Sequence, residues 1–261
     1  QGLVENVQIL SSNLVQNGDF SEEGVQEVSN GSFSQESSEL ITNGDFATDS
    51  NWAKNPNWTI SGGTANCDGT SDGSFFQGSV IQDSKQYLVT YTISNLTQGG
   101  LRVQLSGTQG VLRTLNGTYT EYITSGSNPS GRVSFDCSSS PIGSIDNVSV
   151  REVGQDWNLG TGWSIGEDKA VADGTTNNAI SQTTISSVVG KSYKIDFTID
   201  DYVTGNIRIY FGGVFTPFVN SNGVYSFYIA ATAVDALATS ASGLFNGSIT
   251  NISVKEVGMD W

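Results

Sequence analysis

A stretch that occurs twice constrains this chain more than any other feature of its sequence. Residues Ile145–Trp157 read Ile-Asp-Asn-Val-Ser-Val-Arg-Glu-Val-Gly-Gln-Asp-Trp, and residues Ile249–Trp261 read Ile-Thr-Asn-Ile-Ser-Val-Lys-Glu-Val-Gly-Met-Asp-Trp. Upstream segments match in the same order: Trp58–Ile60 with Trp163–Ile165, Tyr87–Ile93 with Tyr193–Ile199, Leu101–Val103 with Ile207–Ile209, and Asn116–Ile123 with Asn222–Ile229. A whole unit is therefore repeated, which predicts two tandem domains with one fold.

The repeated unit has the composition and periodicity of an all-β domain. The 261 residues of the whole chain include 31 Gly but only one Met, and good helix formers are scarce. Apolar and polar residues alternate along most segments, and turn residues recur about every ten positions, as in a β-sandwich. We predict two β-sandwiches, over residues 40–153 and 154–261. Trp58 and Trp163 are expected in their cores, and Trp52 and Trp157 as half-exposed rings at a sandwich end.

Residues 1–39 form an N-terminal arm with a different pattern. Leu14–Phe20, Glu27–Phe33 and Leu40–Phe46 each contain an Asn-Gly pair followed two residues later by Phe, with a period of 13 residues. Asn-Gly favours a tight turn, and each copy is too short to bury its own apolar residues. The arm is either a flexible spacer, or it adds short strands to a neighbouring subunit or larger assembly. The second sandwich has no such segment within its own range.

Charge and residue usage exclude several classes of function. A net charge of −15 without any basic run argues against nucleic acid as a partner, and no apolar run is long enough for membrane insertion. Histidine is absent, which removes the usual nucleophilic triads. Cys67 and Cys137 have no counterparts in the second unit, so two buried thiols are favoured over a disulfide.

The ordered segments resemble a known kind of domain. Asn43–Phe46, the Trp58–Gly63 segment, Tyr87–Ile93 and the closing Ile145–Val150 occur in the order found in galactose-binding-like jelly rolls that serve as carbohydrate-binding modules. The tandem style, rich in Gly, Ser, Thr and Asn, is also similar to repeat modules of tailed-bacteriophage structural proteins. The resemblance implies tandem jelly-roll β-sandwiches. It also implies a possible structural calcium in the first sandwich, for which Asp45 and Asp146 are the candidate ligands; the alternative is that Asp45 accepts hydrogen bonds from backbone amides at its turn.

A sugar site requires an aromatic platform with polar groups around it. Along two matching strands, the face opposite the apolar one carries Arg102 and Gln104 in the first unit, and Arg208 and Tyr210 in the second. We predict a carbohydrate platform of Arg208 and Tyr210 with Tyr225 or Tyr228 nearby, with solvated surface or a subunit contact as the alternatives. A catalytic pair of carboxylates is not expected, because the second-unit acids lack acidic counterparts in the first; these are Asp196, Asp200, Asp201 and Asp235.

These features predict a non-enzymatic virion structural protein, from a tail fibre, neck or capsid decoration, located on the virion surface. Its expected partners are further copies of itself, a trimer in particular, and other virion proteins, with host surface glycans as a further candidate. The alternative function is a carbohydrate-binding module pair of a secreted bacterial polysaccharide-degrading enzyme, or a surface adhesin. Because Trp261 stands where a further repeat would begin, we expect the chain to be a piece of a longer polypeptide.

Overall fold

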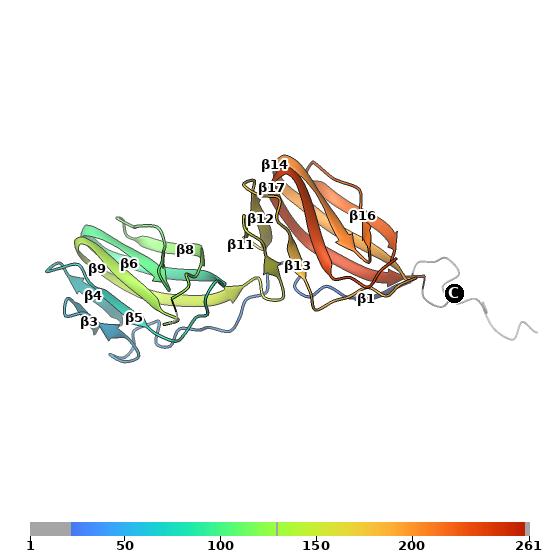
Figure 1. Ribbon diagram of the computed structural model, residues 1–261. Helices are drawn as coiled ribbons and strands as arrows, with labels where there is room; N and C mark the ends of the chain where they lie inside the picture. The colour runs from blue at the N-terminus through green and yellow to red at the C-terminus, as the bar shows by residue number, and fades with distance from the viewer. Residues whose placement is uncertain (1–21, 129, 259–261) are drawn as a thin grey trace, which may run out of the picture. The chain divides into compact units, whose positions relative to one another are not determined.

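The computed structural model describes residues 22–128 and 130–258, and this part of the chain is all-β, as predicted. It divides into two compact units, residues 32–173 and residues 22–31 with 174–258 (Figure 1). The strands of the first are β2 (Ala53–Lys54), β3 (Trp58–Ser61), β4 (Thr64–Asp68), β5 (Ser74–Gln77), β6 (Gln86–Leu105), β7 (Thr108–Gln109), β8 (Gly117–Thr124), β9 (Val133–Val153), β10 (Asn158–Leu159), β11 (Trp163–Gly166) and β12 (Lys169–Asp173). The strands of the second are β1 (Glu23–Gln26), β13 (Ile180–Gln182), β14 (Ser192–Phe211), β15 (Val214–Phe215), β16 (Gly223–Ala230) and β17 (Leu237–Val257).

Two long antiparallel strands, β6 and β9, form the frame of the first sandwich (Figure 1). The first half of β6 pairs with β8 and the end of β9, whereas its last residues pair with β7 and the start of β9. Register shifts between Ser94 and Gly100 separate the two halves. Gly99 is required there, because its φ is 67° and a Cβ would lie 2.7 Å from the Ser138 carbonyl oxygen. One strand thereby serves both layers of the sandwich.

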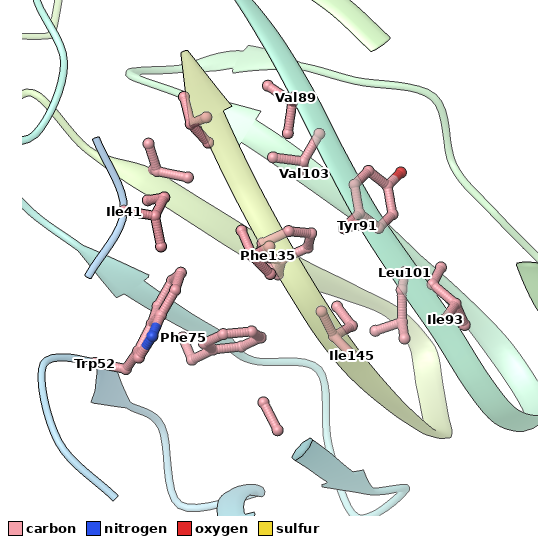
Figure 2. Close-up of a cluster of buried hydrophobic side chains, with 14 of the residues drawn as sticks. Ile41, Trp52, Phe75, Val89, Tyr91, Ile93, Leu101, Val103, Phe135 and Ile145 are labelled. Atoms are coloured by element: carbon pink, nitrogen blue, oxygen red, sulfur yellow. The ribbon is translucent and has the colours of Figure 1, made fainter. Parts of the chain in front are cut away.

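The core of the first sandwich follows from period-two alternation along these strands. Tyr87, Val89, Tyr91 and Ile93 point inward from β6 and are almost fully buried. Figure 2 shows Val89, Tyr91 and Ile93 of this row in one cluster with Phe75, Phe135 and Ile145 from β5 and β9. Each such side chain stabilises the fold by about 1.5–3 kcal/mol relative to an exposed one.

The four tryptophans among the described residues are buried, which corrects one expectation. Trp58 and Trp163 lie in the interior, as predicted. Trp52 and Trp157, however, are only 6% and 7% exposed, so the prediction of half-exposed rings was wrong. The physical reason is that each is covered by a phenylalanine from an Asn-Gly-x-Phe segment: Phe46 lies 5.4 Å from Trp52 and Phe33 4.9 Å from Trp157, between ring centroids.

The second sandwich repeats the strand pairing of the first. Residues 192–199 of β14 pair with β16 in the same eight-residue pattern by which residues 86–93 of β6 pair with β8. Residues 206–210 pair instead with the start of β17, after register shifts around Thr204. The two tandem jelly-roll β-sandwiches predicted from the repeat are therefore confirmed.

In the first sandwich, the Asn43–Phe46 segment is held against the closing part of β9. The Gly44 carbonyl accepts a hydrogen bond from the Val148 amide at 2.9 Å, and a Cβ at Gly44 would lie 2.0 Å from the Val148 oxygen. Upstream of the turn, Thr42 exchanges two hydrogen bonds with the Gln77 side chain, and Ile41 is buried. Only glycine at position 44 permits the backbone to lie this close to the Val148 carbonyl oxygen.

The Asn30–Phe33 segment makes the same contacts in the second unit, where the sequence offered no local equivalent. The Gly31 carbonyl accepts a hydrogen bond from the Ile252 amide at 2.9 Å, and a Cβ at Gly31 would again lie 2.0 Å from the facing oxygen. Ser29 exchanges two hydrogen bonds with Gln182, and Val28 is buried. Residues 23–33 of the arm are thus neither a free spacer nor a strand given to another subunit: they complete this chain's own sandwiches.

Ion pairs fix the outer end of this arm. Glu23, in β1, accepts hydrogen bonds from Lys194 at 2.6 Å and Lys255 at 2.9 Å. Hydrogen bonds from these two lysines lower the pKa of Glu23 to about 2. The earliest copy, Leu14–Phe20, lies outside the described residues. Among the residues that are described, no helix is long and apolar enough to cross a membrane.

Candidate functional site

An aromatic cluster built around one arginine stands on the second sandwich. The guanidinium carbon of Arg208, on β14, lies 3.7 Å from the ring centroid of Phe215 and 4.2 Å from that of Phe218. Both phenylalanine rings remain well exposed, at 44% and 43%. Tyr210 packs beside Phe215 with 4.8 Å between centroids. Arg208, Tyr210, Phe215 and Phe218 are called the Arg208 platform below.

A half-buried carboxylate gives the Arg208 platform its polar edge. The Tyr210 hydroxyl donates to Asp235 at 2.7 Å, and this hydrogen bond raises the pKa of the phenol. The Arg208 Nε donates to the Ser240 hydroxyl at 3.4 Å. Apolar ring surface and directional polar groups therefore stand together, which is the combination that sugar recognition needs.

Local sequence explains why the cluster forms. Alternation along β14 turns Ile207 and Ile209 into the core, so that Arg208 and Tyr210 face outward. The short strand β15 pairs Phe215 directly with Tyr210. The hydroxyl oxygen of the buried Thr216 accepts a hydrogen bond from the Ile209 amide at 3.0 Å, which holds the loop that carries Phe218.

Two of the four residues of the Arg208 platform were thus predicted from the sequence. Arg208 and Tyr210 do lie together, but the aromatic partners are phenylalanines that the sequence reasoning did not select. Phe215 and Phe218 flank a Thr-Pro pair in a loop where the first unit has Gln109 and Leu112. The sequence signal that could have identified the platform is a pair of aromatic residues in this segment that the first unit lacks.

Tyr225 and Tyr228 lie on β16, which pairs with the first half of β14, and not beside Tyr210 in its second half. Tyr225 is paired with Phe197, and their rings stack at 5.5 Å between centroids. Tyr228 is paired with Lys194 and is 70% exposed. Neither belongs to the Arg208 platform, because β14 changes its pairing partners between residues 200 and 206.

The corresponding face of the first sandwich is mostly polar, and its Phe76 ring is half-buried under the Arg132 guanidinium, whose carbon lies 3.5 Å from the ring centroid. Arg102 is paired with Asp136, and Gln104 with Ser134 and Gln109. Burial raises the pKa of Asp136, and this effect outweighs the lowering of the pKa by the positive charges of Arg102 and Arg132. The buried Arg102 Nε has no hydrogen-bond partner. Arg102 and Gln104 therefore share a face, as predicted, but form no aromatic platform.

The first sandwich also contains a buried charged network. Glu121 on β8 accepts hydrogen bonds from the Tyr91 hydroxyl at 2.6 Å and the Val111 amide at 2.8 Å. Arg113 pairs with the same carboxylate at 3.1 Å. Burial and the hydrogen bond to Glu121 raise the pKa of Tyr91. Phe197 replaces Tyr91 in the second unit, so this network holds one loop of the first sandwich.

The predicted calcium ligands do not form a cation site. Asp45 accepts a hydrogen bond from the Ala47 amide at 3.3 Å, as the alternative interpretation predicted. Both carboxylate oxygens of Asp146 are used by its neighbour Asn147, at 2.6 and 3.2 Å. Within residues 22–128 and 130–258, no group of three or more Cys, Asp or Glu side chains could hold a metal ion. The residues present therefore do not fit calcium, which needs six to eight oxygen ligands.

The two cysteines are free and buried, as the sequence favoured. The Cys67 thiol donates to the Gly143 carbonyl at 3.3 Å. A side-chain hydrogen bond with Cys137 and burial raise the pKa of Cys67. The same hydrogen bond lowers the pKa of Cys137. Both side chains are buried, so they act as small core residues.

Comparison with known proteins yields similarity of fold alone. No family model and no curated protein sequence matches the chain. Among solved structures, the N-terminal CBM22-1–CBM22-2 tandem domain of Paenibacillus barcinonensis Xyn10C is 10% identical, with 85% of this chain and 98% of that one covered and a TM-score of 0.31. Allantoicase from Saccharomyces cerevisiae is 9% identical over 74% of this chain and 80% of its own, with a TM-score of 0.30.

Proposed function

We propose that this chain is a non-enzymatic carbohydrate-binding protein whose second sandwich binds glycans through the Arg208 platform. The observation that carries the proposal is the pair of exposed phenylalanine rings, 44% and 43% accessible, held in place by one guanidinium. Rings fixed in this way lose little conformational entropy when a sugar stacks on them. The Asp235 carboxylate and the remaining guanidinium hydrogens supply directional partners for hydroxyl groups.

The ligand class follows from charge. The chain carries a net charge of −15, and the platform includes a carboxylate beside Tyr210. A polyanionic glycan would be repelled by this field. The expected ligand is therefore a neutral oligosaccharide or polysaccharide that presents an apolar sugar face.

The test is a glycan array with the full chain, followed by titration calorimetry on the best neutral ligand. Phe218→Ala and Tyr210→Ala should each weaken binding at least tenfold, because stacking aromatic residues are typical binding hot spots. Tyr228→Ala is the matched control, since it removes an exposed aromatic ring outside the platform. A ligand bound equally by all three variants would contradict the proposal.

The second candidate function is the virion structural protein predicted from the repeat style. The observation that favours it is the completion of the second sandwich by a short segment from far upstream in the chain, a device suited to linking modules in an appendage. In this role the chain would lie on the particle surface as a homo-oligomer and contact other virion proteins. Mass spectrometry of purified particles tests it: the absence of its peptides from every particle would exclude the virion role.

A further inference from the structure

The face of the first sandwich that corresponds to the Arg208 platform carries two arginines and one carboxylate. Arg102 on β6 is paired directly with Asp136 on β9, which is paired in turn with Ser74 on β5. Direct partners in antiparallel strands point to the same side of a sheet. Because the neighbouring Phe135 is fully buried, these three side chains point away from the core.

The second arginine, Arg132, lies just before β9 and reaches the same face. Its guanidinium donates a hydrogen bond to the Ser74 hydroxyl at 3.0 Å, and its carbon lies 3.5 Å from the centroid of the Phe76 ring. Stacking on a ring holds the plane of a guanidinium in place. Arg102, Arg132, Asp136 and Ser74 are called the Arg102 face below.

The two guanidinium groups are partly withdrawn from water without a bonded anion. Both arginine side chains are half-buried, and the Nε atoms of Arg102 and Arg132 are buried without a hydrogen-bond partner. Asp136 accepts a hydrogen bond from the Ser134 hydroxyl at 3.4 Å, and it interacts with the two arginines only through their charge. Partly desolvated cations of this kind bind an added anion more strongly than fully exposed ones do.

The donors and the acceptor of the Arg102 face together specify the ligand. A planar carboxylate matches the fork of a guanidinium, whereas Asp136 repels an anion and accepts a hydrogen bond from a hydroxyl group. A ligand that satisfies both must carry a hydroxyl group close to its carboxylate, as uronate sugars do. A neutral sugar lacks the carboxylate, and a plain carboxylate such as acetate lacks the hydroxyl group.

We propose that the Arg102 face binds a uronate residue of an acidic saccharide, with the carboxylate on Arg102 and Arg132 and a neighbouring hydroxyl group on Asp136. This site is on the other sandwich from the Arg208 platform, and it rests on the proposed function only in taking a sugar as its ligand. Two guanidinium groups outnumber one carboxylate here, and exposed charges farther away than about 8 Å are largely screened at physiological salt. A single acidic residue can therefore bind although the chain has a net charge of −15.

The test is an NMR titration of the isotope-labelled full chain, which follows the arginine Nε–H signals. Methyl glucuronide is the probe, methyl glucoside is its neutral parent, and acetate is the plain carboxylate. The glucuronide should shift the signals of Arg102 and Arg132 and bind at least tenfold more tightly than either of the other two compounds. Equal binding of methyl glucoside or of acetate would contradict the proposal.

Variants of the full chain locate the binding to the Arg102 face. Arg102→Gln should weaken glucuronide binding at least tenfold, and Asp136→Asn should remove the preference for the glucuronide over acetate. Arg132→Lys keeps the charge but loses the fork, so it should weaken binding even where Arg102→Gln lowers the stability of the sandwich. Arg151→Gln is the matched control, because the Arg151 guanidinium is already paired with Glu36 at 3.0 Å. An equal loss of binding in Arg151→Gln would overturn the assignment.

This proposal and the proposed function fail independently of each other. Phe218→Ala should weaken the binding of neutral glycans and leave methyl glucuronide binding unchanged, whereas Arg102→Gln should have the opposite effects. Glucuronide binding that is lost in Phe218→Ala would place the uronate on the Arg208 platform and overturn the proposal. Neutral binding that depends on Phe218, without any glucuronide binding, would leave the proposed function standing and refute the second site.

Discussion

Replacing Phe33 by alanine tests whether the arm is an integral part of the fold. Phe33 is 1% exposed, and its ring lies 4.9 Å from that of Trp157. Truncation of a buried phenylalanine costs about 3–5 kcal/mol, because contacts are lost and a cavity remains. With a urea dependence of about 2–3 kcal/mol per molar, the midpoint of unfolding should fall by about 1–2 M. A free arm, by contrast, would make the substitution silent.

The assay is urea unfolding followed by tryptophan fluorescence and by circular dichroism. Phe46→Ala is the positive reference, because Phe46 covers Trp52 in the same way. Val25→Ala is the matched control, since Val25 belongs to the same arm but is 79% exposed, and its loss should change stability by less than about 0.5 kcal/mol. Docking of the arm would be refuted if Phe33→Ala and Val25→Ala unfolded at the same urea concentration as the wild type while Phe46→Ala did not.

Three further predictions concern the ion pairs, the buried network and the close approach of glycine. The depressed pKa of Glu23 means that its ion pairs stabilise the fold above pH about 4.5 and lose this effect as the pH falls toward about 2. Glu23→Gln should therefore lower the free energy of unfolding by less than about 1 kcal/mol at pH 6 and leave it unchanged at pH 2, as measured by urea unfolding. Tyr91→Phe should cost about 1.5–3 kcal/mol in the same assay, because the buried Glu121 carboxylate loses a hydrogen bond, and an unchanged midpoint would show the bond to be dispensable. Gly44→Ala should cost at least about 2 kcal/mol, since its Cβ would lie 2.0 Å from the Val148 oxygen; full stability would mean that this approach is not needed.

The fold could be predicted from the sequence because its signals are local and repeated. Period-two alternation places Tyr87, Val89 and Tyr91 on one side of a strand wherever that strand lies. The duplicated closing stretch then gives the number of sandwiches. Both signals depend only on neighbouring residues and on comparison of one half of the chain with the other.

The docking of the arm and the composition of the platform could not be predicted in this way. The partner of Gly31 is Ile252, and nothing near Gly31 in the sequence identifies it. Likewise, Phe215 reaches Tyr210 only because β15 folds back on β14. The prediction that Trp157 is half-exposed was wrong for the same reason, since the ring that covers it is that of Phe33, far upstream in the sequence.

Because an early segment pairs with a late strand, the two sandwiches can complete their folding only at different times during synthesis. Gln26 bonds to Val254 across 228 positions, whereas Glu39 bonds to Val150 across 111. During synthesis the ribosome must deliver nearly the whole chain before the first of these contacts can form, and at about 5–20 residues per second this takes ten seconds or more. The first sandwich can close while its neighbour is still being made. The second must wait, with the apolar face that Val28 will cover open to solvent and to chaperones until β17 emerges.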